Sequence, residues 1–263
     1  MKSTEYKNPP VFEVGMTFHF QPSGDTPEWN DVVALEYVKK YQSRFPTTEF
    51  VVQQEFRIET NIKEKTQRAG VTSPKFSEVY ARSEDQSEVL GIGLNYFTYH
   101  KIRLGQSFPH FRPVAQSAFD FLPEYIDFWK PEKIKQISLL YLDVIEIPSQ
   151  QFDLDEYFHL GLKVPKEFGA ITDFENRFTF PGKQAHMQLD IVFQRVPARN
   201  LNESVTQFCI HWNCRKSEIN TLDTAKIRDE MDGLHEYVRE CFEASFTDKC
   251  KELFVPVLEG EQS

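Results

Sequence analysis

The sequence predicts an α+β fold made of two similar halves, each with the order strand, helix, three strands, helix. Several runs of strand length alternate apolar and polar residues. A few longer segments instead place apolar residues at helical spacing. The same order of elements recurs on both sides of residue 130. Meandering strands beside long helices favour mostly antiparallel sheets with helices packed against them.

The first half begins with an alternating strand at Val11–Phe20. Thr26 is a typical N-cap and Pro27 suits the first helical position, so we expect a helix from there to Phe45. Pro46 ends that helix. The strands expected next are Phe50–Glu59, Ser77–Arg82 and Glu88–His100. A polar loop at Asn61–Pro74 separates the first two of these strands, and a second helix at Phe111–Trp129 completes this half.

The second half begins with a β-rich run at Ile134–Ile147, which Pro148 ends. The last helix carries an apolar stripe that faces a core. The elements expected after the first strand are a short helix at Asp153–Leu160, strands at Ile171–Phe180, Ala185–Val196 and Ser204–Arg215, and a helix at Thr221–Ser245. The halves, 1–130 and 131–263, meet at a short seam without linker composition, so we expect one integrated unit.

Aromatic residues are numerous: the chain holds 24 Phe, 10 Tyr and 3 Trp. Rings at this density usually fill the space between a sheet and its helices. The alternative is a surface on which a ligand or a base stacks. Both interpretations stay open at this level.

The net charge of −10 is concentrated near the C-terminus, where residues 217–263 hold twelve acids and five bases. A protein that binds nucleic acid nonspecifically needs a basic face, so we expect no such binding. The acidic last helix is either a solvated face or a docking surface for a basic protein partner. Asp229, Glu236 and Glu240 are the candidate partner-binding residues.

Four cysteines lie in the last quarter of the chain, and the polar N-terminal segment lacks a secretory apolar region. No run approaches the ~18 apolar residues of a membrane span. We therefore expect a cytoplasmic protein with reduced thiols and no membrane contact.

No P-loop, dinucleotide-binding or zinc-protease motif is present. Strand alternation places Cys209 and His211 on one face and Cys214 on the other, which excludes a shared metal site, so we expect no metal and no cofactor. If the last two strands pair, Asp190 joins Cys209 and His211, the minimum set for acid–base or thiol catalysis. The alternative is the solvated side of an antiparallel sheet. Asp143 and Glu146 point to opposite faces of one strand and cannot act as a pair.

Four stretches together resemble a sporadically distributed prokaryotic family of uncharacterised proteins of about this length. Gln136, Leu140 and Asp143 depart from that family's pattern around the third stretch. The resemblance implies one unit along the chain and carriage on mobile or defence-related gene clusters, and it brings no reaction with it. The stretches are Asn8–Val14, Leu94–Tyr99 followed by Phe111, Ile137–Ile145, and Leu234–Val238 continuing to Thr247.

Two functions from different classes fit these observations. The missing catalytic motifs and the acidic helix favour a non-enzymatic accessory subunit that binds another protein, such as an antitoxin-like or immunity protein. The alternative is a sensor or enzyme for a small ligand, including a nucleotide, bound in a pocket between the two halves.

Overall fold

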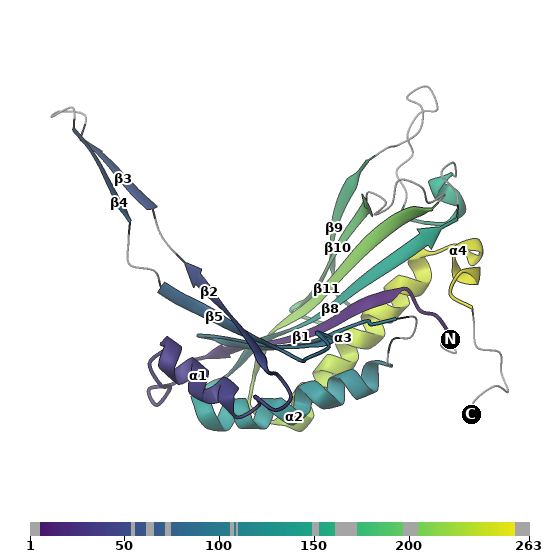
Figure 1. Ribbon diagram of the computed structural model, residues 1–263. Coiled ribbons are helices and arrows are strands. Elements are labelled where there is room, and N and C mark those ends of the chain that lie inside the picture. The colour runs from purple at the N-terminus through teal and green to yellow at the C-terminus, as the bar shows by residue number, and fades with distance from the viewer. Residues whose placement is uncertain are drawn as a thin grey trace.

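The computed structural model shows one large antiparallel sheet covered on one face by helices (Figure 1). The other face of the sheet is open, and the sheet curves so that this face is concave (Figure 1). The structure describes residues 6–53, 56–61, 66–71, 75–105, 108, 110–148, 153–160, 173–196 and 205–255.

The large sheet has nine strands in the order β2-β5-β6-β7-β1-β8-β11-β10-β9, and every neighbouring pair is antiparallel. A separate hairpin, β3–β4, projects beyond β2 and β5 (Figure 1). The strands are β1 Val11–Gln21, β2 Thr47–Gln53, β3 Phe56–Asn61, β4 Thr66–Val71, β5 Lys75–Arg82, β6 Glu88–Gly93, β7 Tyr96–Ile102, β8 Lys133–Ile147, β9 Glu175–Pro181, β10 Met187–Val196 and β11 Thr206–Thr221.

Helices α1, α2 and α3 lie below the sheet, where α2 and α3 run under its centre, and α4 lies beside one end of the sheet (Figure 1). Side chains cap three of the helices: Asn30 at α1, Asp223 at α3 and Thr247 at α4 each accept a backbone N–H. The helices are α1 Asp31–Lys39, α2 Phe111–Trp129, α3 Thr224–Ser245 and α4 Asp248–Glu252, with a 3₁₀ turn η1 at Leu154–Glu156.

Strand alternation divides the residues of the sheet between the two faces. In β1, Met16 and Phe18 are fully buried beneath the helices, whereas Thr17 and His19 lie on the open face and are half-buried. The covered face carries large apolar side chains from every central strand and forms one continuous core with α2 and α3. Many of the aromatic side chains lie in this core, which is the first of the two interpretations that composition left open.

The expectation of two similar halves is wrong, because a single sheet runs through both. β1 pairs directly with β8, with Met16 opposite Leu139 and Phe18 opposite Ile137. An exposed strand edge leaves backbone N–H and C=O groups unpaired, and this pairing satisfies both edges at once. The helical elements also differ: α1 has nine residues, while η1 in the corresponding place has three.

Three local expectations are corrected. The first helix begins at Asp31 rather than after Thr26, whose hydroxyl instead contacts the carbonyl oxygen of Lys130 at 3.4 Å. The predicted strand Glu88–His100 is a hairpin, β6–β7, with a turn between its strands. Within the segment predicted as a loop, Asn61–Pro74, the structure places strand β4.

Other elements agree with the sequence. α2 has the predicted bounds, and β1 and β8 differ from theirs by one residue at one end. The stripe predicted on α3 is Ile227, Met231, Leu234, Val238 and Cys241, of which the first four are buried and Cys241 is half-buried. In the described part of the chain, no helix has both the length and the apolar character that crossing a membrane requires.

Candidate functional site

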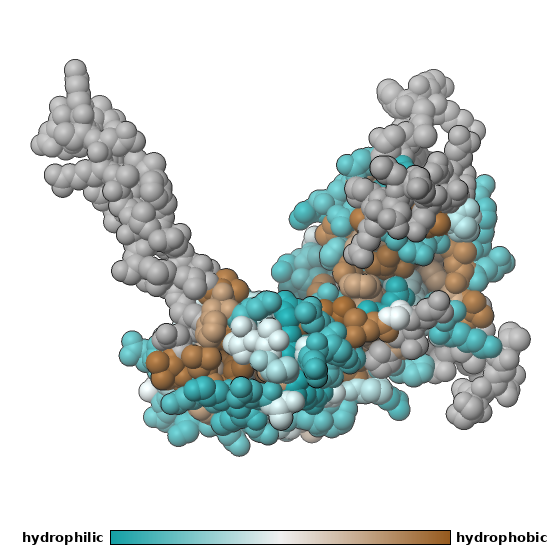
Figure 2. Space-filling model, in the orientation of Figure 1, coloured by the Kyte–Doolittle hydropathy of each residue, from teal (hydrophilic) through white to brown (hydrophobic). Residues whose placement is uncertain are grey.

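A hollow of about 410 Å³ lies on the open face of the sheet, across the β1–β8 pairing. Figure 2 shows that the molecule is hollowed above the centre of the sheet, between the end with β2 and β5 and the end with β9 and β10. Strands from both halves of the chain contribute. The lining residues are Thr17, His19, Tyr80, Tyr96, Thr98, His100, Gln136, Ser138, Leu140, Asn213 and Arg215.

Glycines in the sheet let aromatic rings lie down on its open face. A Cβ atom at Gly15 would be 2.5 Å from Cε1 of His100, and one at Gly91 would be 2.7 Å from Cε1 of Tyr80. A Cβ at Gly93 would likewise collide with the ring of Tyr96. Part of the floor of the hollow therefore consists of three rings, and each of these rings depends on the absence of a side chain beneath it.

A chain of polar contacts enters the hollow from the N-terminal end of β1. Glu13 Oε1 lies 2.6 Å from His100 Nδ1, and His100 Nε2 lies 2.8 Å from the hydroxyl of Thr98. That hydroxyl is 2.8 Å from the hydroxyl of Thr17, which borders the hollow. A carboxylate thus orients an imidazole, and the imidazole orients two hydroxyls.

The opposite end of the hollow carries a guanidinium held by a carboxylate. Arg215 Nη2 lies 3.2 Å from Asp190 Oδ2. The hydroxyl of Thr179 and the amide of Gln188 donate to the other oxygen of Asp190, at 2.8 and 2.9 Å. Arg215 keeps further N–H donors for a bound group, because its guanidinium has five.

Burial favours the neutral forms of three ionisable rings that line the hollow. Burial lowers the pKa of His19 and raises the pKa values of Tyr80 and Tyr96. Gln136 Nε2 donates to the hydroxyl of Ser138 at 3.3 Å. The site can therefore form neutral hydrogen bonds and stacking contacts, with Arg215 as its fixed charge.

The three candidate catalytic residues do share the open face, since β10 pairs with β11 as the sequence suggested. Cys209 Sγ lies 3.5 Å from His211 Nε2. Asp190 instead binds Arg215, Thr179 and Gln188. Burial raises the pKa of the Cys209 thiol to about 11 and lowers that of His211, so the neutral thiol predominates at pH 7. The arrangement therefore lacks an activated nucleophile.

Cys214 faces the core, opposite to Cys209 and His211, as strand alternation predicted. All four cysteines are free. Among the residues that the structure describes, no group of three or more His, Cys, Asp or Glu side chains could hold a metal ion.

The three acidic candidates on α3 are exposed and lie along one stripe of the helix. Glu236 pairs with Arg239 of the same helix, and Glu240 pairs with Lys183. These residues lie on the helical layer, not in the hollow on the open face.

Asp143 and Glu146 point to opposite sides of β8, as expected. Asp143 is 1% exposed and accepts a hydrogen bond from the Trp212 indole at 2.7 Å. Burial raises its pKa to about 7. Its Oδ1 atom has no hydrogen-bond partner among the described residues.

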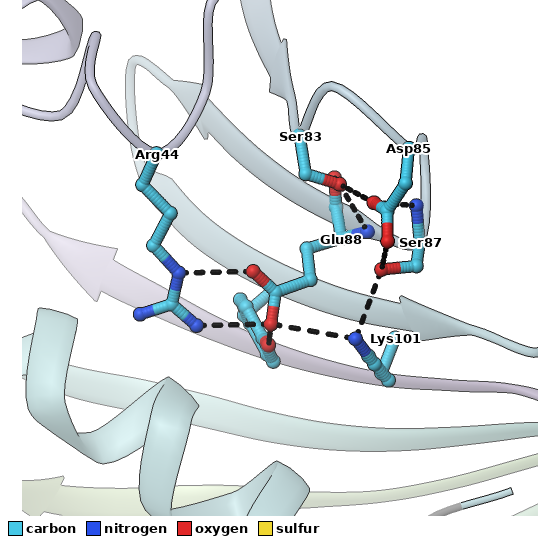
Figure 3. Close-up of polar contacts among 7 residues, drawn as sticks. Arg44, Ser83, Asp85, Ser87, Glu88 and Lys101 are labelled. Atoms are coloured by element: carbon cyan, nitrogen blue, oxygen red, sulfur yellow. Dashed lines mark hydrogen bonds and ion pairs between the residues drawn. The ribbon is translucent and has the colours of Figure 1, made fainter.

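A second polar cluster joins the loop after α1 to the sheet and has a structural role (Figure 3). Arg44 makes two 2.9 Å hydrogen bonds to Glu88, and Tyr99 donates to the same carboxylate at 2.8 Å. Lys101 lies 3.5 Å from Glu88 and donates to Ser87 at 2.9 Å. Because these groups satisfy one another, the cluster offers little to a ligand.

Sequence reasoning did not identify the lining of the hollow. The available signal was the presence of Gly15, Gly91 and Gly93 inside strand patterns, where glycine often marks the close approach of another group. No family model matches this chain, and no curated protein matches it.

Proposed function

We propose that this protein binds a small, planar, polar ligand of the nucleoside or nucleotide kind in the hollow across the β1–β8 pairing. The observation that carries the proposal is the floor of rings over glycines, bordered by hydroxyl, amide and guanidinium groups. The sequence left small-ligand binding in a pocket between two halves as an alternative function, whereas the hollow lies on one continuous sheet.

The size and chemistry of the hollow support this choice. Its volume of about 410 Å³ falls within the range of roughly 300–1,000 Å³ typical of ligand sites. A base stacked on an aromatic ring gains about 1–3 kcal/mol, and every base has a face that can stack. Gln136 and Asn213 supply amides of the kind that bind base edges, and Arg215 suits a phosphate.

We favour binding without catalysis. The Cys209 thiol stays protonated, and Thr98, the hydroxyl beside His100, belongs to a residue that is only 4% exposed. A buried hydroxyl with three polar neighbours is poorly placed to attack a substrate.

Thermal unfolding in the presence of nucleosides and nucleotides tests the proposal. A ligand at 100 times its Kd adds about 2.7 kcal/mol to the free energy of unfolding, which raises the midpoint measurably. Tyr96→Leu should remove the shift, whereas Tyr237→Leu on α3 makes the same chemical change outside the hollow and should keep it. If no nucleoside or nucleotide moves the midpoint, the proposal is wrong.

A second candidate function is supported by the exposed stripe on α3. We propose that, if the protein is an accessory or defence-associated subunit, a basic protein partner docks at Asp229, Glu236 and Glu240. As part of this proposal, the chain is a member of the sporadic prokaryotic family that it resembles, and it acts in the cytoplasm. Co-purification with the products of neighbouring genes should be lost in the triple variant Asp229→Asn, Glu236→Gln, Glu240→Gln.

A further inference from the structure

Thr98 lies at the branch point of the hydrogen-bond chain, and its single proton determines the polarity of Thr17. The Thr98 hydroxyl has three neighbours: the Met16 carbonyl oxygen at 3.1 Å, and His100 Nε2 and the Thr17 hydroxyl, each at 2.8 Å. A carbonyl oxygen can only accept. All three bonds therefore form together only when Thr98 donates to Met16 and accepts from both His100 and Thr17.

The protonation of His100 does not alter this result for Thr17. With a proton on each ring nitrogen, His100 donates to Glu13 and to Thr98. If His100 is neutral and donates to Glu13, the Thr98 proton turns to Nε2, and Thr17 still donates to Thr98. The remaining arrangement, in which Thr98 donates to Thr17, forms one bond fewer than the best arrangement in either protonation state of His100. Thr17 thus directs its proton inward and presents lone pairs to the hollow.

Ser138 can supply the complementary donor. It is the direct partner of Thr17 in the β1–β8 register, so the two side chains are neighbours on the open face. Its hydroxyl accepts a hydrogen bond from Gln136 Nε2 at 3.3 Å, which leaves its own proton for a bound group. An acceptor and a donor therefore stand side by side at the centre of the hollow.

We propose that the hollow recognises the lactam edge of a nucleobase, in which a ring N–H stands next to a carbonyl group. The N–H donates to Thr17, the carbonyl oxygen accepts from Ser138, and the base stacks on the ring floor beside Tyr96. Uracil, guanine and hypoxanthine have this edge; adenine and cytosine present a bare ring nitrogen there instead. This inference rests on the proposed function and names the ligand class within it.

Calorimetric titration with matched nucleosides tests the inference. Uridine, guanosine and inosine are each compared with the analogue methylated at the ring N–H: 3-methyluridine, 1-methylguanosine and 1-methylinosine. We expect at least one parent nucleoside to bind and its methylated analogue to bind at least ~10-fold more weakly, because a lost hydrogen bond in a polar site discriminates strongly.

Variants at the two hydroxyls assign that discrimination to residues. Thr17→Val keeps the shape but removes the acceptor, and should bring the ratio between parent and analogue close to one. Thr17→Ser keeps the hydroxyl and should preserve the ratio. If Thr17→Val fails to fold, the comparison of parent with methylated analogue on the unaltered protein still decides.

Three outcomes overturn the inference, and they differ in what they say about the proposed function. Equal binding of parent and methylated nucleosides, or a ratio that Thr17→Val leaves unchanged, refutes the lactam contact alone. Binding of adenosine or cytidine, but of no lactam base, also refutes it while the ligand site stands. Absence of binding by uridine, guanosine, inosine, adenosine and cytidine refutes the lactam contact, and the proposed function fails with it only if no nucleotide shifts the thermal midpoint either.

Discussion

The two faces of the sheet are built from the same strands but have different roles. In β1, Phe18 is fully buried between Phe97 and Phe119, while the adjacent Thr17 lies on the open face. The covered face contributes most of the apolar burial, and the open face contributes a shaped polar surface. The difference shows that one alternating strand can carry stability and recognition on successive residues.

The largest loss of stability should come from removing a side chain that is buried on the covered face. Phe18→Ala removes a buried ring, so we expect the free energy of unfolding to fall by about 3–5 kcal/mol. Thr17→Val, one residue away, loses a single hydrogen bond and should cost no more than about 1.5 kcal/mol. Urea unfolding of both variants measures the two losses of stability. Equal losses would show that the two faces do not differ in their contribution to stability.

A comparable effect concerns the one carboxyl group buried within the covered face of β8. The pKa of Asp143 rises from an unfolded value of ~3.9 to about 7 in the folded protein. The folded state thus holds its proton more tightly, and the associated stability is complete below pH ~4 and lost as the pH rises to about 7. The loss is on the order of 4 kcal/mol.

Denaturant unfolding between pH 4 and pH 8 checks this prediction. Asp143→Asn cannot ionise, so the gap between its stability and that of the unaltered protein should move in favour of the variant as the pH rises. A constant gap over this range would show that folding does not raise the pKa of Asp143.

A smaller effect is expected at the cluster that joins the α1 loop to the sheet (Figure 3). Glu88→Gln weakens the charged bonds to Arg44 and Lys101 in a partly buried setting and should cost about 1–2 kcal/mol at pH 7. The Arg44 guanidinium lowers the pKa of Glu88, so this stability is lost as the pH falls through that pKa. Glu236→Gln, which disrupts an exposed pair, is the control and should cost less than about 0.5 kcal/mol.

The smallest effect on stability should come from the outer side of α3. Asp229→Asn is an exposed change on a solvated helix face, so we expect it to alter the free energy of unfolding by less than about 0.5 kcal/mol. Thermal unfolding measures this. A clearly larger loss would mean that Asp229 supports the fold and would weaken its candidacy for partner binding.

Strong local patterns made part of the fold predictable. α2 and the buried stripe of α3 follow from helical spacing, and β1 and β8 follow from alternation and the stop at Pro148. The start of α1 was misplaced because Thr26 and Pro27 have the composition of a helix start, but Thr26 contacts the end of α2 instead. Such a long-range contact has no local signal.

The candidate site was less predictable, for a physical reason. Alternation correctly placed Asp190, Cys209 and His211 on one face, but the partners of Asp190 depend on the register of β9, β10 and β11. The ring floor depends on contacts between neighbouring strands, such as His100 over Gly15. The pairing of β1 with β8, which places the hollow at the middle of the sheet, joins residues more than a hundred positions apart.

That central pairing also bears on how the chain reaches its native state during synthesis. When a ribosome has released only the first 130 residues, β1 has its β7 neighbour available but lacks β8 on its other side. An uncovered strand edge of this length invites association with other nascent chains. The free edge of β1 can therefore be covered only after residues 133–147, which form β8, have been translated.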